Sequence, residues 1–538
     1  MVLFEGDQVK NTGRTNLITT VIVCKRIIIP AACALLLSLL IGALIPLFLS
    51  IGSYEQAWLA GSLVTFITLL VLIFVWQRAG AQKVIFWMML TAFALRLILG
   101  ILLAYGLPKF GYPEDSQLAG YFFYDAFMRD SQAWSLTTSG ESLVKAFSGA
   151  FANDQYGGLL ALSALVYRIF SPDAHRPYLM VIVSAGVSAL GIPFLVNAAK
   201  RFVSMKYALV AGWIMVLFPE TLLLGASQMR EPFMITGFAI SFWALATWFS
   251  IKNHKIRVIG LSIGLLTMFI LSTRTAVILA VFLFLWFWIE VSGHLTKKWF
   301  KVVGWVLICL IVGVLLGFSW GWLKEVMHWD MLLAYRGSGW IELIFDSTPE
   351  WVHAPFLIVY GLFQPVLPAA IVDPAPWIWQ TIGIMRGIGW YALLPFLIYG
   401  IFVVIRTDDK KEKHLLIWLV LATWGWILLS SARAGGDQWD NPRYRMILIP
   451  WMSLLAAYVL NWSKVHHSRW LWRWVIVECI FLLFFTHWYI SRYTGIFTRI
   501  PFITMVALII GLGGAVLLGG WLLDRRRAKD QSINHKED

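Results

Sequence analysis

Long apolar segments alternate with short polar ones along almost the whole chain. Each apolar segment is close to the roughly 20 residues that an α-helix needs to cross a bilayer. The pattern therefore predicts an all-α, polytopic transmembrane helix bundle. We predict about fourteen spans, at 28–50, 57–76, 84–106, 178–198, 205–222, 232–250, 256–272, 275–291, 300–320, 387–405, 414–431, 446–462, 470–490 and 500–523.

Composition agrees with a membrane protein. Of 538 residues, 59% are hydrophobic and 13% are charged, and a soluble domain of that composition could not cover its surface with polar groups. The net charge of +14 would suggest nucleic-acid binding in a soluble protein. Here the basic residues lie mostly in short loops between apolar segments, where they orient helices. We therefore expect membrane lipids as partners and no nucleic acid.

The loops also predict an orientation. With a cytoplasmic N-terminus, the inner loops are all rich in Lys and Arg: QRAGAQK, AKRFVSMK, IKNHKIR, GHLTKKWFK, RTDDKKEKH, SKVHHSRWLWR and DRRRAKD. Both termini are then cytoplasmic, in a plasma (inner) membrane protein. This alternation requires that residues 155–171 lie at the outer surface without crossing, and they are short for a span. Residues 1–27 are read as a retained segment, not a cleaved leader.

Four regions follow from this arrangement. Residues 1–83 hold the N-terminal segment and two extra spans, and 84–320 form a catalytic transmembrane module with an acidic outer loop at 107–177. Residues 321–386 form an outer, lid-like loop, in a stretch whose prolines are expected to break regular helices. Residues 387–538 hold the last spans and a basic cytoplasmic tail.

The outer loops carry acidic residues that could do chemistry. Asp125 and Arg129 share a helical face by their spacing, and Asp130 projects from a nearby side. A carboxylate at the membrane surface can act as a general base toward an acceptor, although a solvated or capping Asp is an equally good interpretation. Glu231 precedes Pro232 where a span begins, which suits a helix-start acid. Its functional alternative is to bind the acceptor or a divalent ion across a cavity from Asp125.

Arginines supply the basic side of the candidate site. Arg443 and Arg445 stand in DNPRYRMILIP at the start of a span, and Arg274 lies in STRTAV at the outer boundary. Arg230, beside Glu231, is a further candidate. A guanidinium fork matches the oxygens of a phosphate, so we expect these residues to bind a phosphate or pyrophosphate leaving group. The alternative is that they reach lipid headgroups as ordinary anchors.

Several of these segments resemble the GT-C glycosyltransferases, in the branch of protein mannosyltransferases and aminoarabinose transferases. The span ending ALRLILGILL, followed by an outer loop with Asp125, Ala133 and Gly140, resembles the start of that family. YGGLLALSALVYRIFSP resembles its surface helix, VLFPETLLLGASQMREPFM its second acidic loop, and RYRMILIPWMSLLAA a late segment. The resemblance covers about residues 84–460, and Arg129 stands where an aromatic residue is usual.

The resemblance implies transfer of a sugar from a polyprenyl-phosphate donor to an acceptor at the outer face. Asp125 would be the base, Glu231 would take the place of the second acid, and Arg443 and Arg445 would hold the lipid phosphate. The apolar spans and the 319–385 loop would cradle the prenyl chain. The acceptor, whether protein, lipid or glycan, is not identified. Some relatives need no metal, so no cofactor is certain and a divalent metal ion stays open.

Two other functions fit parts of the pattern. A polysaccharide polymerase or O-antigen ligase also uses lipid-linked sugars, many spans and a large outer loop. Activity lost in Asp125→Asn but kept when the loop arginines are changed would favour the GT-C function over it. A lipid or solute transporter would place ionisable residues at mid-membrane depth, whereas most of the acids here cluster at the outer boundary.

Overall fold

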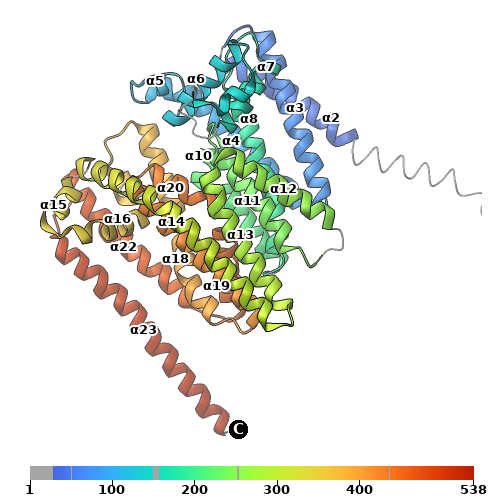
Figure 1. Cartoon of the computed structure of the whole chain (residues 1–538). Helices are drawn as coiled ribbons and strands as arrows, with labels where there is room; N and C mark the ends of the chain where they lie inside the picture. Colours follow the sequence, from blue (N-terminus) through green and yellow to red (C-terminus); the bar gives the residue numbers. More distant parts are fainter. Residues whose placement is uncertain are drawn as a thin grey trace, which may run out of the picture.

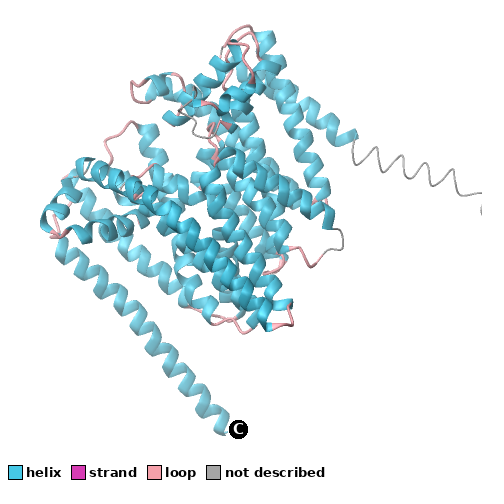
Figure 2. Cartoon of the chain, in the orientation of Figure 1, coloured by secondary structure: helices cyan, strands magenta, loops and turns pink. Residues whose placement is uncertain are grey.

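The computed structural model describes residues 28–49, 51–149, 157–250, 254–337, 339–435 and 437–537. Every regular element within these ranges is a helix (Figure 2), so the predicted all-α class is confirmed. The polar segment at 1–27, interpreted from sequence as a retained cytoplasmic segment, lies outside the described residues.

Eleven helices in the described ranges are long and apolar enough to cross a membrane, or twelve if one bent pair is a single span. They are α2 (Ile29–Phe48), α3 (Tyr54–Arg78), α4 (Lys83–Phe110), α8 (Tyr178–Ala199), α12 (His254–Leu271), α13 (Thr273–His294), α18 (Trp377–Ile405), most of α19 (Lys410–Ala434), the continuous stretch Asp440–Val465, α22 (Trp470–Tyr493) and the first part of α23 (Phe502–Glu537). The stretch Asp440–Val465 contains α20 (Asp440–Arg445), η4 (Met446–Leu448) and α21 (Ile449–Val465).

The prediction of about fourteen spans differs at three segments. The predicted span 205–222 is the bent pair, α9 (Met205–Leu217) and α10 (Pro219–Gly225), which meet at 55°. The predicted span 232–250 is α11 (Glu231–Ala246), with only 16 residues. The predicted span 300–320 is part of the 40-residue helix α14 (Lys298–Gly337). None of these helices is by itself one of the eleven candidate spans.

The bend between α9 and α10 is stabilised by Arg96 of α4. Its guanidinium donates to the carbonyls of Met215 at 3.1 Å and Val216 at 3.2 Å, and to the Thr221 hydroxyl at 3.1 Å. Carbonyls at the end of a helix need such partners, because water is absent inside a bilayer. The buried Arg96 therefore has a structural role here.

The described residues between the end of α4 and the start of α8, 111–149 and 157–177, form a cap of short helices at one end of the bundle (Figure 1). The cap contains α5 (Asp115–Leu118), α6 (Tyr124–Thr138), η2 (Leu143–Phe147) and α7 (Gly158–Phe170). With 13 residues, α7 is too short to be a candidate span, as expected for segment 155–171. It begins after Gly157, which has φ +70° and lies against the backbone of Ala146, a conformation that favours glycine.

The predicted lid-like loop is largely helical. Between the end of α14 and the start of α18 lie α15 (Gly339–Ser347), α16 (Glu350–Leu362) and α17 (Leu367–Val372). The expectation that prolines break all regular structure here was wrong, because Pro349, Pro368 and Pro376 stand at helix starts, where the missing N–H costs nothing. The boundaries drawn after residues 320 and 386 fall inside α14 and α18.

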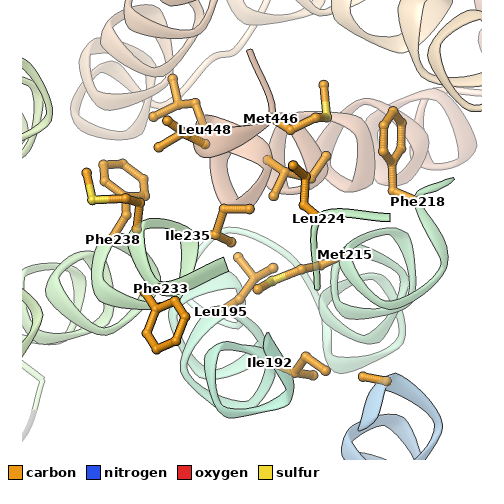
Figure 3. Packing of buried hydrophobic residues seen from close by; sticks show 14 of the residues in the cluster. Ile192, Leu195, Met215, Phe218, Leu224, Phe233, Ile235, Phe238, Met446 and Leu448 are labelled. Carbon is orange, nitrogen blue, oxygen red and sulfur yellow. The ribbon is translucent and has the colours of Figure 1, made fainter. Parts of the chain in front are cut away.

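The core lies where α8, α9, α11 and α21 pack together. Figure 3 shows Ile235 and Phe238 of α11 facing Met446 and Leu448 of η4, with Leu195 and Met215 close by. These side chains are almost fully buried, and inside a bilayer such close packing stabilises helix contacts through van der Waals interactions. The packing holds the first turn of α11 beside α20, which places Glu231 next to Arg443.

A candidate active site around Arg443

Arg443 is positioned by a short turn before α20. The Asp437 carboxylate accepts hydrogen bonds from the backbone N–H groups of Trp439 at 2.5 Å and Asp440 at 2.7 Å. An aspartate that bonds to the backbone just beyond it fixes a tight turn. The helix that follows carries Arg443 toward the first turns of α6 and α11.

Three carboxylates surround the Arg443 guanidinium. Nη2 lies 3.1 Å from Asp125 Oδ2, Nε lies 3.0 Å from Glu231 Oε1, and Nη1 lies 3.1 Å from Asp440 Oδ1. Only 4% of the Arg443 side chain is exposed, and a buried charge needs such partners. The structure thus brings Asp125, Glu231 and Arg443 together although they are far apart in sequence.

The three carboxylates differ in exposure. The Asp125 and Asp440 side chains are 54% and 45% exposed, whereas Glu231 is 1% exposed. No hydrogen bond reaches either carboxylate oxygen of Glu231 among the described residues, although Arg443 Nε lies 3.0 Å from Oε1. Glu231 therefore depends on the charge of Arg443, while Asp125 and Asp440 can be reached from outside.

Asp125, Asp440 and Arg443 line an open pocket with a volume of about 610 Å³, including the solvent space at its mouth. Its polar wall also includes Glu114, Ser116 and Gln117. The sequence interpretation used only Asp125 and Arg443 from this lining.

Aromatic rings form the other wall of the pocket. Phe122 and Trp379 are stacked, with centroids 4.2 Å apart and planes at 23°, and Trp439 meets Trp379 edge-on at 4.7 Å. The Trp379 indole N–H donates to Gln117 Oε1 at 2.8 Å. A flat apolar surface thus faces a charged one across the same opening.

A buried ion pair holds this aromatic wall in place. Arg386 of α18 pairs with Glu220 of α10, with Nη2 to Oε1 at 3.0 Å, and both side chains are almost fully buried. Arg386 Nη2 also donates to the Trp439 carbonyl at 3.0 Å, and its guanidinium lies 4.4 Å from the Trp439 ring centre. Sequence analysis missed Arg386. A charged residue inside an apolar span is the signal that could have found it.

Asp130 does not line the pocket. Its carboxylate is buried and accepts hydrogen bonds from the hydroxyls of Tyr121 and Tyr167, both at 2.5 Å, and His175 Nε2 lies 2.7 Å away. Burial and the Asp130 charge raise the pKa of Tyr121 and Tyr167 well above 10, so both hydroxyls keep their protons. Asp130 therefore ties α6 to α7 and to the loop before α8, which orients the helix that carries Asp125.

Asp130→Ala is expected to destabilise the cap. The substitution leaves two buried tyrosine hydroxyls without their acceptor, at a cost of roughly 1–3 kcal/mol for each unsatisfied group. Tyr121→Phe removes one hydroxyl and is expected to cost less. Thermal unfolding of the purified protein in detergent would measure both. An Asp130→Ala protein as stable as the parent would show that the cluster is not structural.

The other predicted phosphate ligands are placed differently from Arg443. Arg445 is buried, donates to the carbonyl of Gln364 at 2.6 Å, and lies 3.3 Å from the centre of the Trp390 ring. It does not line the pocket. Arg274 is exposed near the start of α13 and is also absent from the pocket lining.

Arg230 and a second arginine lie near Tyr444. Arg230 is half-buried just before α11 and interacts electrostatically with Tyr444. Arg433, which sequence analysis missed, lies 4.0 Å from the centre of the Tyr444 ring. Arg443 Nη2 in turn donates to the Tyr444 hydroxyl at 3.1 Å, so two arginines contact this tyrosine and Arg230 acts on it electrostatically.

Among the described residues, no three His, Cys, Asp or Glu side chains are arranged to hold a metal ion. The acids that sequence analysis considered for a divalent ion surround the Arg443 guanidinium instead.

The chain was also compared with known proteins. No protein-family model, curated protein or solved structure matches it.

Proposed function

We propose that this protein is an integral membrane glycosyltransferase. It moves a sugar from a polyprenyl-phosphate donor to a protein, lipid or glycan acceptor at the extracytoplasmic face of the plasma (inner) membrane. The observation that carries the proposal is the contact between half-exposed Asp125 and buried Arg443 at a pocket with one aromatic wall. The resemblance of short motifs to GT-C enzymes adds support, because the motifs include the segments that carry Asp125, Glu231 and Arg443.

Asp125 acts as the general base. It accepts the proton of the acceptor hydroxyl while that oxygen bonds to the anomeric carbon of the sugar. The bond from the anomeric carbon to the phosphate oxygen breaks in the same step, and polyprenyl phosphate leaves with the electron pair. Attack opposite the leaving group inverts the anomeric centre. The Arg443 contact, 3.1 Å from Nη2 to Oδ2, holds the Asp125 carboxylate in one orientation.

The leaving phosphate needs positive charge beyond Arg443, because Asp125, Glu231 and Asp440 already surround that guanidinium. Arg230 and Arg433 do not line the pocket either, but both interact with Tyr444, the neighbour of Arg443, and in this proposal they supply the charge from beside the pocket. Guanidinium groups bind phosphate oxygens in pairs. In this arrangement Arg443 is chiefly a positioning residue for Asp125.

The aromatic wall accommodates the sugar ring. The Trp379 and Trp439 rings, which both line the pocket, offer apolar contact to the C–H groups of a pyranose. Gln117 and Glu114, which line the same pocket, can bind its hydroxyls. A pocket of this kind suits a carbohydrate better than an ion.

A neighbouring apolar cavity gives the prenyl chain a place. It encloses about 870 Å³ of empty space and shares Phe122 with the Arg443 pocket. Leu103, Ala104, Leu118 and Val181 are among its lining residues. An isoprenoid chain there would place its phosphate near the charged pocket.

The proposal is tested with the full-length protein in proteoliposomes. Polyprenyl monophosphates that carry a radiolabelled sugar are added with a membrane extract as acceptor, and label lost from the lipid fraction is measured. The expected result is protein-dependent transfer of label to a non-prenyl product. Solute or lipid movement without cleavage of the sugar–phosphate bond would overturn the proposal in favour of a transporter.

A further inference from the structure

A second charged cavity lies at the other end of the bundle from the cap. It is an open cavity between α13, α14 and α19 with a volume of about 1300 Å³, including the solvent space at its mouth. In Figure 1 the end of α13 and the starts of α14 and α19 lie at the bottom of the bundle, while α5, α6 and α7 lie at the top. This cavity is therefore separate from the Arg443 site.

Basic side chains dominate the charge of this cavity. Lys301 of α14 and Lys410 and His414 of α19 line it, together with one acid, Glu290 of α13. The Glu290 carboxylate is buried and paired with Arg201. Arg201 therefore compensates the charge of Glu290, so this carboxylate does not compensate the positive charges of Lys301 and Lys410.

Within the described ranges, neither Lys301 nor Lys410 forms an ion pair. Two positive charges are thus available to an anion that enters the cavity.

The rest of the lining is apolar and continuous with the outer surface of α14. Trp305 and Trp418 contribute rings, and the Trp418 indole N–H donates to the Phe282 carbonyl at 3.0 Å, which fixes it. Val302, Val306 and Leu310 of α14 are exposed next to this region. Trp beside Lys at the end of apolar helices is typical of the bilayer interface.

We propose that this cavity binds the phosphate headgroup of an anionic phospholipid. Lys301 and Lys410 hold the phosphate, His414 and the Trp305 ring border the glycerol, and the acyl chains lie along the exposed face of α14. Basic pockets between membrane helices bind anionic headgroups in this way. The apolar surface beside the cavity favours a lipid over a free anion, which would need only the charges.

The test uses the full-length protein, delipidated in a neutral detergent. Its affinity for phosphatidylglycerol in mixed micelles is measured against phosphatidylcholine and against inorganic phosphate. The double variant Lys301→Gln/Lys410→Gln is compared with the matched control Lys297→Gln/Lys298→Gln, which removes two exposed lysines outside the cavity.

The cavity variant is expected to bind phosphatidylglycerol about thirtyfold more weakly, since each basic residue near an anionic headgroup contributes roughly fivefold. The control variant is expected to bind as the parent does. An equal loss in both variants, or equal binding of phosphatidylcholine, would overturn the proposal. Binding of inorganic phosphate as tight as that of the lipid would assign the cavity to a free anion instead.

A second readout does not depend on the lysine variants folding. Phosphatidylglycerol with brominated acyl chains is expected to quench tryptophan fluorescence in the parent protein, and less in Trp305→Phe. Identical quenching in the two proteins would show that the lipid does not occupy this cavity.

Discussion

Asp125→Asn is expected to lower the rate of sugar transfer by a factor of about 10² to 10⁴, the usual contribution of a positioned general base. The amide keeps the size of the side chain but cannot accept the acceptor's proton. Because Asp125 is half exposed at the first turn of α6, the substitution should leave the fold intact. Initial rates in the proteoliposome assay, together with the thermal unfolding temperature, measure the two effects separately.

Asp115→Asn is the matched control for this experiment. Asp115 is an exposed aspartate in the first turn of the neighbouring helix α5 and does not line the pocket. It is expected to transfer sugar at the parental rate. Asp125→Asn with near-parental activity would contradict the assignment of Asp125 as the base, and an equal loss in both variants would indicate a general effect on the cap.

Arg443→Met is expected to have the largest effect on stability. It removes the guanidinium that neutralises Glu231 and leaves that buried carboxylate without a counter-charge. Breaking a buried ion pair in this way costs roughly 3–5 kcal/mol. The free energy of unfolding can be measured by titration with a denaturing detergent in mixed micelles, and we expect activity to be lost as well.

A second substitution separates the structural role of Arg443 from its role in the reaction. Glu231→Gln/Arg443→Met removes the buried charge as well as its partner, so most of the lost stability should return. Activity should not return, because Asp125 still lacks the guanidinium that orients it.

Arg443→Lys keeps the charge, but a lysine lacks the fork needed to contact three carboxylates at once, so low activity is expected. A stable and active Arg443→Met protein would contradict both roles.

The helical class and most spans could be predicted because a bilayer imposes length and hydropathy on each helix that crosses it. The helices that differ from the predicted spans depend on tertiary contacts. The bend between α9 and α10 is sustained by Arg96, which comes from a helix more than 100 residues earlier. The neighbouring helix α11 is short and buried on nearly all sides. Neither feature can be recognised from hydropathy.

The candidate site could be predicted only in part. Charged residues at the ends of spans are costly, which is why Asp125, Glu231 and Arg443 attracted attention. Arg443 and Arg445 could not be distinguished by sequence, since they are two residues apart in one short helix. The structure directs the first to three carboxylates and the second to backbone carbonyls.

Partners distant in sequence account for what the pattern could not show. The Asp130 carboxylate is engaged by Tyr167 and His175, which are 37 and 45 residues away, and neither residue stood out in the sequence. The Glu220–Arg386 pair joins residues 166 apart. Arg386 also holds Trp439 in the pocket wall by donating to its backbone carbonyl. The pattern of side chains in a sequence gives no information on such a contact.

The proposed chemistry requires that α6 and α20 meet at one membrane boundary. The most direct measurement is cross-linking of Asp125→Cys/Asp440→Cys, with the four native cysteines replaced by Ser. Both positions are partly exposed and contact the same guanidinium, so a short, membrane-impermeant bifunctional thiol reagent added to intact cells should join them within one chain. Failure to cross-link, or labelling of the two cysteines from opposite sides of the membrane, would contradict the shared pocket and the function proposed for it.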